Sequence, residues 1–460
     1  MSHGYTIGVR GCQHLGYQPQ GMRLNSGTHW NQRVIDGHYA HEATMRSMLA
    51  AGIDGIVDGG DLCHVSRPLP RDVEAANRVD DLRVAAGVWA VGNSGNHDAG
   101  GGSDVSAMGV MHRPDLGILA VYPDPKRGTG DGIGPFPGLY EIHTSETHPN
   151  LPDGLALHFV SHYGLSRHLK DAGIDIDPTP LPGHVNLFFS HGVFETDERL
   201  YRCIDPHGEE RPIPGEWALR GWDAMLLSHY HTLGAVPGYG DGDRGQVWYT
   251  GSSLRRGFSD EEGVRGWLQV TVHDTGKVSI KAVPIWQRPQ HELPIIDAHG
   301  LTVAELDDQI TAHLGSVALV DTESATLTGD PGAIVRQTIR HSTVTQRQGL
   351  AALRGRYLEL TNEAAWWAIN FDKPVTAAAV GPRSLDSRAV TARVTDFAGE
   401  LDRRADRLLH TVGVPESLTE PVLEQAQAWA SGVHSNADMP EPASASTPTA
   451  AVPGLEDGAA

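Results

Sequence analysis

Short apolar runs alternate with amphipathic segments through the first quarter of the chain. Runs of β-branched and aromatic residues at 5–9, 54–57 and 88–91 predict buried strands. Apolar residues recur at helical spacing between 34 and 49 and again between 73 and 82, which predicts a helix after each of the first two strands. Strands and helices in this order indicate parallel β-α-β units. We therefore expect an α/β fold.

Further strands are expected after residues 100–137, a stretch that is rich in Gly, Pro and Asp and is typical of irregular loops. The next strand-like runs lie at 139–144, 155–160, 185–189 and 222–227. Apolar and polar residues then alternate at 247–249, 267–272 and 278–285. We expect these later strands to complete a second sheet, so that residues 1–290 form one large core.

The pattern changes near residue 290, where a small α+β unit is expected over 291–365. Thr302 and Glu305 have the spacing of a capping box that opens a helix. The rest of this unit is predicted to contain a strand at 333–339, a helix at 345–353 and a strand at 357–360.

The last part of the chain divides into a helical region, 366–433, and a tail, 434–460. Apolar spacing predicts two amphipathic helices at 401–409 and 418–429. The tail is rich in Pro, Ala, Ser and acidic residues without periodicity, and such a composition cannot bury enough apolar surface to fold.

Composition narrows the functional classes. The chain has 36 basic and 57 acidic residues, a formal charge of -21, which is the opposite of the footprint of a general nucleic-acid binder. If the substrate is DNA, metals and local basic patches must attract it. No stretch approaches the ~18 apolar residues of a membrane span, and no signal peptide is evident. Three cysteines without a CxxC pair favour a reducing compartment. We expect a soluble, cytoplasmic protein with no membrane partner.

Residues that can bind metals follow five of the predicted strands. They are His14 after the first strand, Asp61 and His64 after the second, Asn96, His97 and Asp98 after the third, His191, and the pair His229 and His231. The carboxyl ends of strands in an α/β sheet converge on one crevice, so these side chains can meet. Imidazole, carboxylate and amide ligands without a cysteine cluster suit manganese, iron or zinc in an open catalytic site.

The residue types suggest distinct roles. Asp61 is the natural bridge between two metals about 3.5 to 4 Å apart, which together clamp a phosphoryl group. His229 and His231 are two residues apart, so on an extended strand both can face the site. His97 would protonate or polarise the leaving oxygen, and Asp98 would fix the tautomer of His97.

Four of these motifs resemble, in order, those of the calcineurin-like metallophosphoesterases: Gly60-Asp61, Gly95-Asn96-His97-Asp98, Ser190-His191-Gly192 and Ser228-His229-Tyr230-His231. The stretches 60–68 and 249–252 more narrowly resemble the SbcD and Mre-eleven DNA-repair nucleases. The resemblance covers about residues 5–290 and continues loosely to 365, where those nucleases carry a DNA-binding cap domain. It implies a four-layer α/β/β/α sandwich with a cap and C-terminal helices, manganese dependence, and cleavage of DNA phosphodiesters.

The resemblance also implies ligand sets and partners. Its ligand sets are His14, Asp61 and His231 for one metal, and Asp61, Asn96, His191 and His229 for the other. His97 and His64 become substrate-facing histidines, and Arg67 and Arg255 are candidate substrate-binding residues. The helices at 401–409 and 418–429 would bind an SMC-like ATPase of the SbcC type. A homodimer is compatible with the same resemblance.

The chain departs from the family at two positions. The family begins with Asp-x-His, whereas this chain has Cys12-Gln13-His14 and no acidic residue before Asp36. Cys12 is either a thiolate ligand, which would favour zinc or iron over manganese, or a small buried hydrophobe. Leu254 stands where the family has a Glu.

Three hypotheses remain open from the sequence. The first is a metal-dependent DNA exonuclease or endonuclease, the nuclease subunit of an ATPase-linked repair or recombination complex. The second is a small-molecule phosphodiesterase or phosphatase of the same superfamily, which the acidic charge favours. The third is a degenerate, non-catalytic DNA-binding subunit. Single residues also keep alternatives: His64 can be a solvated loop residue, the arginines at 255 and 256 a solvated pair, and His162 a structural residue.

Overall fold

The computed structural model describes residues 4–98, 118–121, 136–170, 174–194, 211–239, 246–258 and 263–372. All of them belong to the first of two compact units, Met1–Thr376. The helices expected at 401–409 and 418–429 and the tail lie outside the described residues. No helix of the described part is long and apolar enough to cross a membrane.

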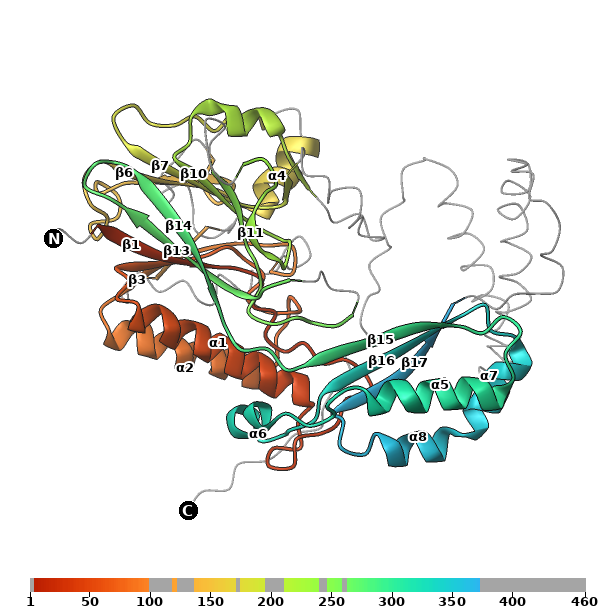
Figure 1. The fold of residues 1–460 in the computed structure, drawn as a ribbon. Coiled ribbons are helices and arrows are strands. Elements are labelled where there is room, and N and C mark those ends of the chain that lie inside the picture. Colours follow the sequence, from red (N-terminus) through yellow and green to blue (C-terminus); the bar gives the residue numbers. More distant parts are fainter. Residues whose placement is uncertain are drawn as a thin grey trace, which may run out of the picture. The chain divides into compact units, whose positions relative to one another are not determined.

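The first sheet has six strands in the order β14-β13-β1-β2-β3-β4 (Figure 1). Its strands are β1 (Tyr5–Arg10), β2 (Gly55–Asp58), β3 (Trp89–Asn93), β4 (Ile118–Val121), β13 (Gly266–Val272) and β14 (Val278–Pro284). Strands β1 to β4 are parallel neighbours, as the β-α-β pattern predicts. Strand β13 pairs antiparallel with β1, and β14 pairs antiparallel with β13.

The expectation that β13 and β14 complete the second sheet is wrong. β13 pairs with β1 in the register Ile7↔Val270 and Val9↔Leu268, and all four side chains are fully buried in one core. Alternation along a strand shows that one face is buried but does not show which sheet the strand joins. The pairing was therefore beyond the reach of the local pattern.

The second sheet also has six strands, in the order β11-β12-β10-β7-β6-β5. They are β5 (Tyr140–His143), β6 (Leu155–Val160), β7 (Val185–His191), β10 (Ala224–Ser228), β11 (Leu233–Ala235) and β12 (Val247–Thr250). The four central strands are parallel, and the two edge strands are antiparallel to their neighbours. A separate two-stranded pair joins β8 (Val193–Phe194) and β9 (Pro212–Ile213).

Alternating side chains divide the core into layers. Leu187 and Phe189 of β7 pack with residues of the first sheet, whereas Phe188 between them packs on the opposite face. Helices α1 (Gln32–Ala50) and α2 (Pro70–Ala85) cover the first sheet, and α4 (His162–Lys170) and the 3-10 helix η4 (Gly215–Arg220) contribute to the core on the outer face of the second (Figure 1). The predicted α/β/β/α sandwich is confirmed.

A third, parallel sheet follows, with the order β15-β16-β17. Its elements are β15 (Gln290–Asp297), α5 (Val303–Gly315), α6 (Thr322–Thr328), β16 (Ile334–Arg340), α7 (Val344–Ala352), α8 (Arg354–Leu360) and β17 (Trp366–Phe371). The capping box of Thr302 and Glu305 is present. The strand expected at 357–360 is wrong, because this segment is α8, and the third strand is β17. The buried Tyr357 donates its hydroxyl to Asp307 of α5 at 3.0 Å, so a tertiary contact selects the helix over the strand-like pattern.

Candidate metal centre

The loops that follow β1 and β2 run side by side and are joined by backbone hydrogen bonds. The N–H groups of Cys12 and His14 donate to the carbonyls of Gly60 and Asp61 at 2.8 and 2.9 Å. β1 and β2 are parallel neighbours that end together, so their loops leave the sheet at the same edge. This pairing brings His14 beside Asp61.

The second sheet supplies the other half of the site. His191 is the last residue of β7 and pairs with Ser228, the last residue of β10, so His229 and His231 follow directly beyond the strand end. His191 Nε2 lies 3.3 Å from Asp61 Oδ2, and His231 Nε2 lies 3.0 Å from His14 Nε2. The carboxyl edges of both sheets therefore meet at one buried cluster.

Four site residues adopt a backbone conformation that ordinary residues rarely adopt. Cys12, His14, Asp61 and His229 have φ values of 51°, 47°, 57° and 105°, and they are four of the six non-glycine residues with positive φ in the described part of the chain. Positive φ costs energy for residues with a Cβ, and such strain concentrates at functional sites. The expectation of a plain extended strand through His229 and His231 is thus wrong, although both side chains do reach the cluster.

Two glycines permit the close approach of these loops. Gly60 has a φ of 102°, and a Cβ there would lie 2.5 Å from the Gly95 nitrogen. A Cβ on Gly95 would lie 2.2 Å from Asp61 Oδ1. Only glycine fits at this contact, where the loop after β3 crosses the Asp61 carboxylate.

Acceptor atoms converge around His191. Its Nδ1 lies 2.8 Å from the Gly59 carbonyl and so carries the proton that this oxygen accepts. The Nε2 lone pair of the neutral ring then faces Asp61 Oδ2 and, at 3.1 Å, Asn96 Oδ1. Three acceptors that face one another need a cation between them. Burial lowers the pKa of His191, but the Asp61 carboxylate outweighs burial and raises it, so a proton can also supply this charge. The donor set fits a divalent metal.

A second group of ligand atoms adjoins the first. Cys12, His14 and His231 offer ligand atoms that lie within 4.8 Å of one another. Burial, Arg256 and the neighbouring imidazoles hold the pKa of His14 well below its usual value, so the ring is neutral and can bind a metal. His14 Nδ1 is buried without a hydrogen-bond partner. His14 Nε2 is 3.8 Å from Asp61 Oδ2, so the Asp61 carboxylate lies between the two groups.

Cys12 contributes to both groups. Its side chain is fully buried, and its sulfur lies within 4.8 Å of ligand atoms of Asp61 and His191 as well as of His14 and His231. The sulfur also accepts the backbone N–H of His229 at 3.4 Å. A thiol therefore lies among the ligand atoms, where the resemblance led us to expect a carboxylate, and either interpretation of Cys12 agrees with this position.

His97 lies against the cluster with its tautomer fixed. Its Nδ1 donates to the His64 carbonyl at 2.7 Å, its backbone N–H donates to Asp61 Oδ1 at 2.8 Å, and its ring lies 4.8 Å from that of His14. The expectation that Asp98 fixes this tautomer is wrong. Asp98 Oδ2 instead accepts the backbone N–H groups of Asp61 and Gly95, at 2.7 and 2.9 Å. Burial and the nearby Asp61 raise the pKa of Asp98 to about 7.

His64 belongs to the same cluster of rings. It stacks on His97 with centroids 5.2 Å apart and meets the Tyr17 ring edge-on at 5.0 Å. Burial, His97 and Arg256 lower the pKa of His64 to about 4. No pattern in the sequence links Tyr17 to His64, so this contact could not be predicted.

The three arginines considered as substrate-binding residues have different surroundings. Arg67 is exposed in the loop between β2 and α2. The Cζ of Arg255 lies 5.9 Å from the centre of the Phe258 ring. The charge of Arg256, in contrast, contributes to lowering the pKa of both His14 and His64. Arg256, which the resemblance did not select, is thus the member of the pair whose charge reaches the cluster. His162 begins α4, and its ring lies 6.1 Å from that of His191.

No family model matches the sequence, and no curated protein matches it. Solved structures with a similar fold include a dimetal phosphatase from Danio rerio, with 11% identity over 61% of this chain and 99% of that one and a TM-score of 0.35. Another is the purple acid phosphatase PPD1 from yellow lupin (Lupinus luteus) seeds, with 12% identity over 62% of this chain and 52% of that one and a TM-score of 0.33.

Proposed function

We propose that the protein is a two-metal phosphoesterase that hydrolyses phosphodiester bonds. One observation carries the proposal: the Asp61 carboxylate lies between two groups of neutral or metal-compatible ligands, with Nε2 atoms of His14 and His191 at 3.8 and 3.3 Å. A bridging carboxylate is the arrangement that a two-metal site requires. Its position supports the bridging role inferred from the sequence.

The residues that would hold the metals come from five strand ends. One set is Cys12, His14, Asp61 and His231, and the other is Asp61, Asn96, His191 and His229. Two divalent cations bound there would polarise the phosphoryl oxygens and acidify a water molecule. The sulfur of Cys12 favours zinc or iron, whereas the remaining imidazole, amide and carboxylate ligands also suit manganese.

His97 is the proposed acid for the leaving oxygen. The His64 carbonyl accepts the Nδ1 proton of His97 at 2.7 Å, so Nε2 is the ring nitrogen that would deliver a proton to the leaving group. His64 stacks on this ring and limits its rotation.

For the substrate class, we favour DNA. The motif 60–68 and the unit after residue 290 resemble the DNA-repair nucleases, which supports an exonuclease or endonuclease that acts with an SMC-like ATPase in DNA repair or recombination. The second candidate is a small phosphodiester or phosphomonoester, and the formal charge of -21 favours it because an acidic protein repels DNA.

The test combines metal analysis with hydrolysis of linear DNA and bis(p-nitrophenyl) phosphate. We expect two metal ions per chain and activity that Asp61→Asn lowers about 1000-fold or more and His97→Ala lowers on the order of 100-fold. Asp81→Asn, at an exposed position on α2, is the matched control and should have no effect. Activity that survives Asp61→Asn would refute the two-metal mechanism.

The same assays separate the alternatives. Turnover of small phosphoesters without DNA cleavage would select the second candidate. One bound metal, no activity in the native protein and a gain of activity in Cys12→Asp would show that the chain is a degenerate, non-catalytic subunit.

A further inference from the structure

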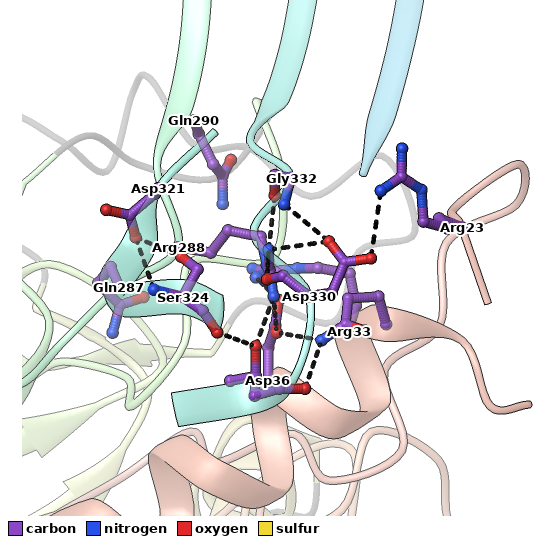
Figure 2. Close-up of polar contacts among 12 residues, drawn as sticks. Arg23, Arg33, Asp36, Gln287, Arg288, Gln290, Asp321, Ser324, Asp330 and Gly332 are labelled. Carbon is purple, nitrogen blue, oxygen red and sulfur yellow. Dashed lines mark hydrogen bonds and ion pairs between the residues drawn. The ribbon is translucent and has the colours of Figure 1, made fainter. Parts of the chain in front are cut away.

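A buried ionic junction joins α1 to the third sheet (Figure 2). Asp36 of α1 accepts hydrogen bonds from Arg288 Nε and Nη2, each at 2.8 Å, and from Arg33 Nη1 at 2.8 Å. All three side chains are fully buried. Arg288 also donates to the Thr328 hydroxyl at 2.7 Å and to the Asp330 carbonyl at 2.9 Å. One carboxylate thus holds two arginines in fixed positions.

The junction extends to a loop of the catalytic core. The second terminal nitrogen of Arg33 donates to the Arg255 carbonyl, and Gln290 Nε2 donates to the same oxygen at 2.9 Å. Gln287 Oε1 accepts the Arg255 N–H at 2.9 Å. Three side chains therefore hold the backbone of one residue after β12, and Arg256 follows this residue directly in the sequence.

The two arginines of this loop have different surroundings. Arg255 lies above Phe258, which is also stacked with Arg336 of the third sheet at 4.5 Å. Beyond Arg256, a Cβ placed on Gly257 would lie 3.5 Å from the Tyr17 hydroxyl, and the Tyr17 ring contacts His64. The segment 256–257 therefore borders the histidine cluster.

On the basis of the proposed function, we propose that Arg256 binds the phosphoryl oxygens of the substrate and that Arg33 positions it through the Arg255 carbonyl. A guanidinium group matches the geometry of two phosphate oxygens and stays charged at any working pH. A protein with a formal charge of -21 needs such a local cation to attract an anionic substrate. Arg256 is thus a substrate-binding residue, and Arg33 is a positioning residue.

The first experiment measures phosphate binding and catalysis separately. Inorganic phosphate is titrated into the metal-loaded full chain by calorimetry, and KM and kcat are measured with bis(p-nitrophenyl) phosphate. Arg256→Ala should weaken phosphate binding and raise KM about 10- to 100-fold, because a charge-assisted hydrogen bond is lost. Arg256→Lys should lie between Arg256→Ala and wild type. Arg46→Ala removes the same charge from a side chain of α1 that is 62% exposed, and it should change neither constant.

The second experiment tests the positioning role. Arg33→Lys retains a cation next to Asp36 but loses the nitrogen that holds Arg255, so it should raise KM several-fold with little change in kcat. In the Arg256→Ala background, Arg33→Lys should have no further effect on KM, since Arg33 acts through Arg256. Independent, multiplicative effects of the two substitutions would overturn the positioning role, whatever the thermal stability of each variant.

The outcomes distinguish this inference from the proposed function. If the wild type hydrolyses phosphoesters and Arg256→Ala retains its KM and phosphate affinity, the role of Arg256 is refuted and the phosphoesterase remains. If phosphate binding depends on Arg256 but no phosphoester is hydrolysed, the anion site stands and the enzyme does not. Absence of phosphate binding by the metal-loaded wild type refutes the inference directly.

Discussion

Two buried carboxylates, Asp36 and Asp61, lie in contrasting surroundings. Asp36 is fully buried, and both of its oxygens accept hydrogen bonds from permanently charged guanidinium groups. Asp61 is 2% exposed, and its Oδ2 faces the imidazole nitrogens of His14 and His191. Permanent charges bind the Asp36 carboxylate, whereas the groups in contact with the Asp61 carboxylate become positively charged only by binding protons or metals.

The backbone shows the same difference. Cys12, His14, Asp61 and His229 of the candidate centre have positive φ, while Arg33, Asp36 and Arg288 do not. A carboxylate whose charge is already neutralised stabilises the fold, whereas strained loops around convergent acceptors favour ligand binding. The contrast therefore distinguishes a structural site from a candidate functional one.

The largest expected effect concerns stability. Asp36→Asn should lower the free energy of unfolding by about 3–5 kcal/mol, because it leaves Arg33 and Arg288 buried without a counter-charge. Urea denaturation measures the change. Glu42→Gln is the control, since Glu42 pairs with Arg46 at the surface, and it should cost about 0.5 kcal/mol or less. A loss below about 1 kcal/mol in Asp36→Asn would show that the junction is not a stabilising feature.

A smaller effect should appear at Asp61 and only with metal. A metal present at about 100 times its dissociation constant should stabilise the wild type by about 2.7 kcal/mol, and a chelator should reverse the gain. Asp61→Asn should abolish most of this gain, while Asp36→Asn should retain it. Thermal unfolding with and without manganese or zinc tests both variants. Equal metal stabilisation of wild type and Asp61→Asn would contradict the assignment of Asp61.

Lowering the pH should affect the stability contributed by Asp36 less than the stability contributed by a buried, neutral histidine. Burial alone would raise the pKa of Asp36, but Arg288 and Arg33 hold it below 3.8, so its contribution is present above pH 3.8 and is lost only as the pH falls through the lower, folded value. His158 of β6 is buried beside Asn186 and Tyr140, and burial lowers its pKa to about 4. Since the unfolded chain binds this proton near pH 6.5, this group alone should lower the free energy of unfolding by roughly 2.5 kcal/mol between pH 6.5 and 4.

Urea denaturation at several pH values measures this decline. His158→Gln should make the slope between pH 6.5 and 4 shallower, and Asp36→Asn should leave that slope unchanged. An unchanged slope in His158→Gln would mean that other buried histidines account for the acid sensitivity.

Much of the fold followed from local patterns. Strand ends at Asp61, Asn96 and His191 were predictable because period-2 and period-3.6 patterns mark where buried strands and their helices begin and end. The antiparallel placement of β13 and β14 and the helix at Arg354–Leu360 were not, because pairing partners and tertiary contacts decide them.

The candidate site could be predicted from the sequence less completely than the fold. The types and order of the candidate ligands led to the cluster. The orientation of Asp98 depends on a hydrogen bond to a distant segment, and the effect of the Arg256 charge on the pKa of His14 depends on the fold that brings them near each other. The junction of Arg33, Asp36 and Arg288 was also missed, since Asp36 and Arg288 are 252 residues apart and no local signal connects them.

The wide separation of the site residues along the chain also affects folding. His14 and His231 are 217 residues apart and belong to different sheets, so the loop between them closes only when both sheets have packed. A nascent chain would present isolated imidazoles with little affinity for metal. Metal uptake would then be a late event in biogenesis, and stoichiometric loading would report that the core has matured correctly.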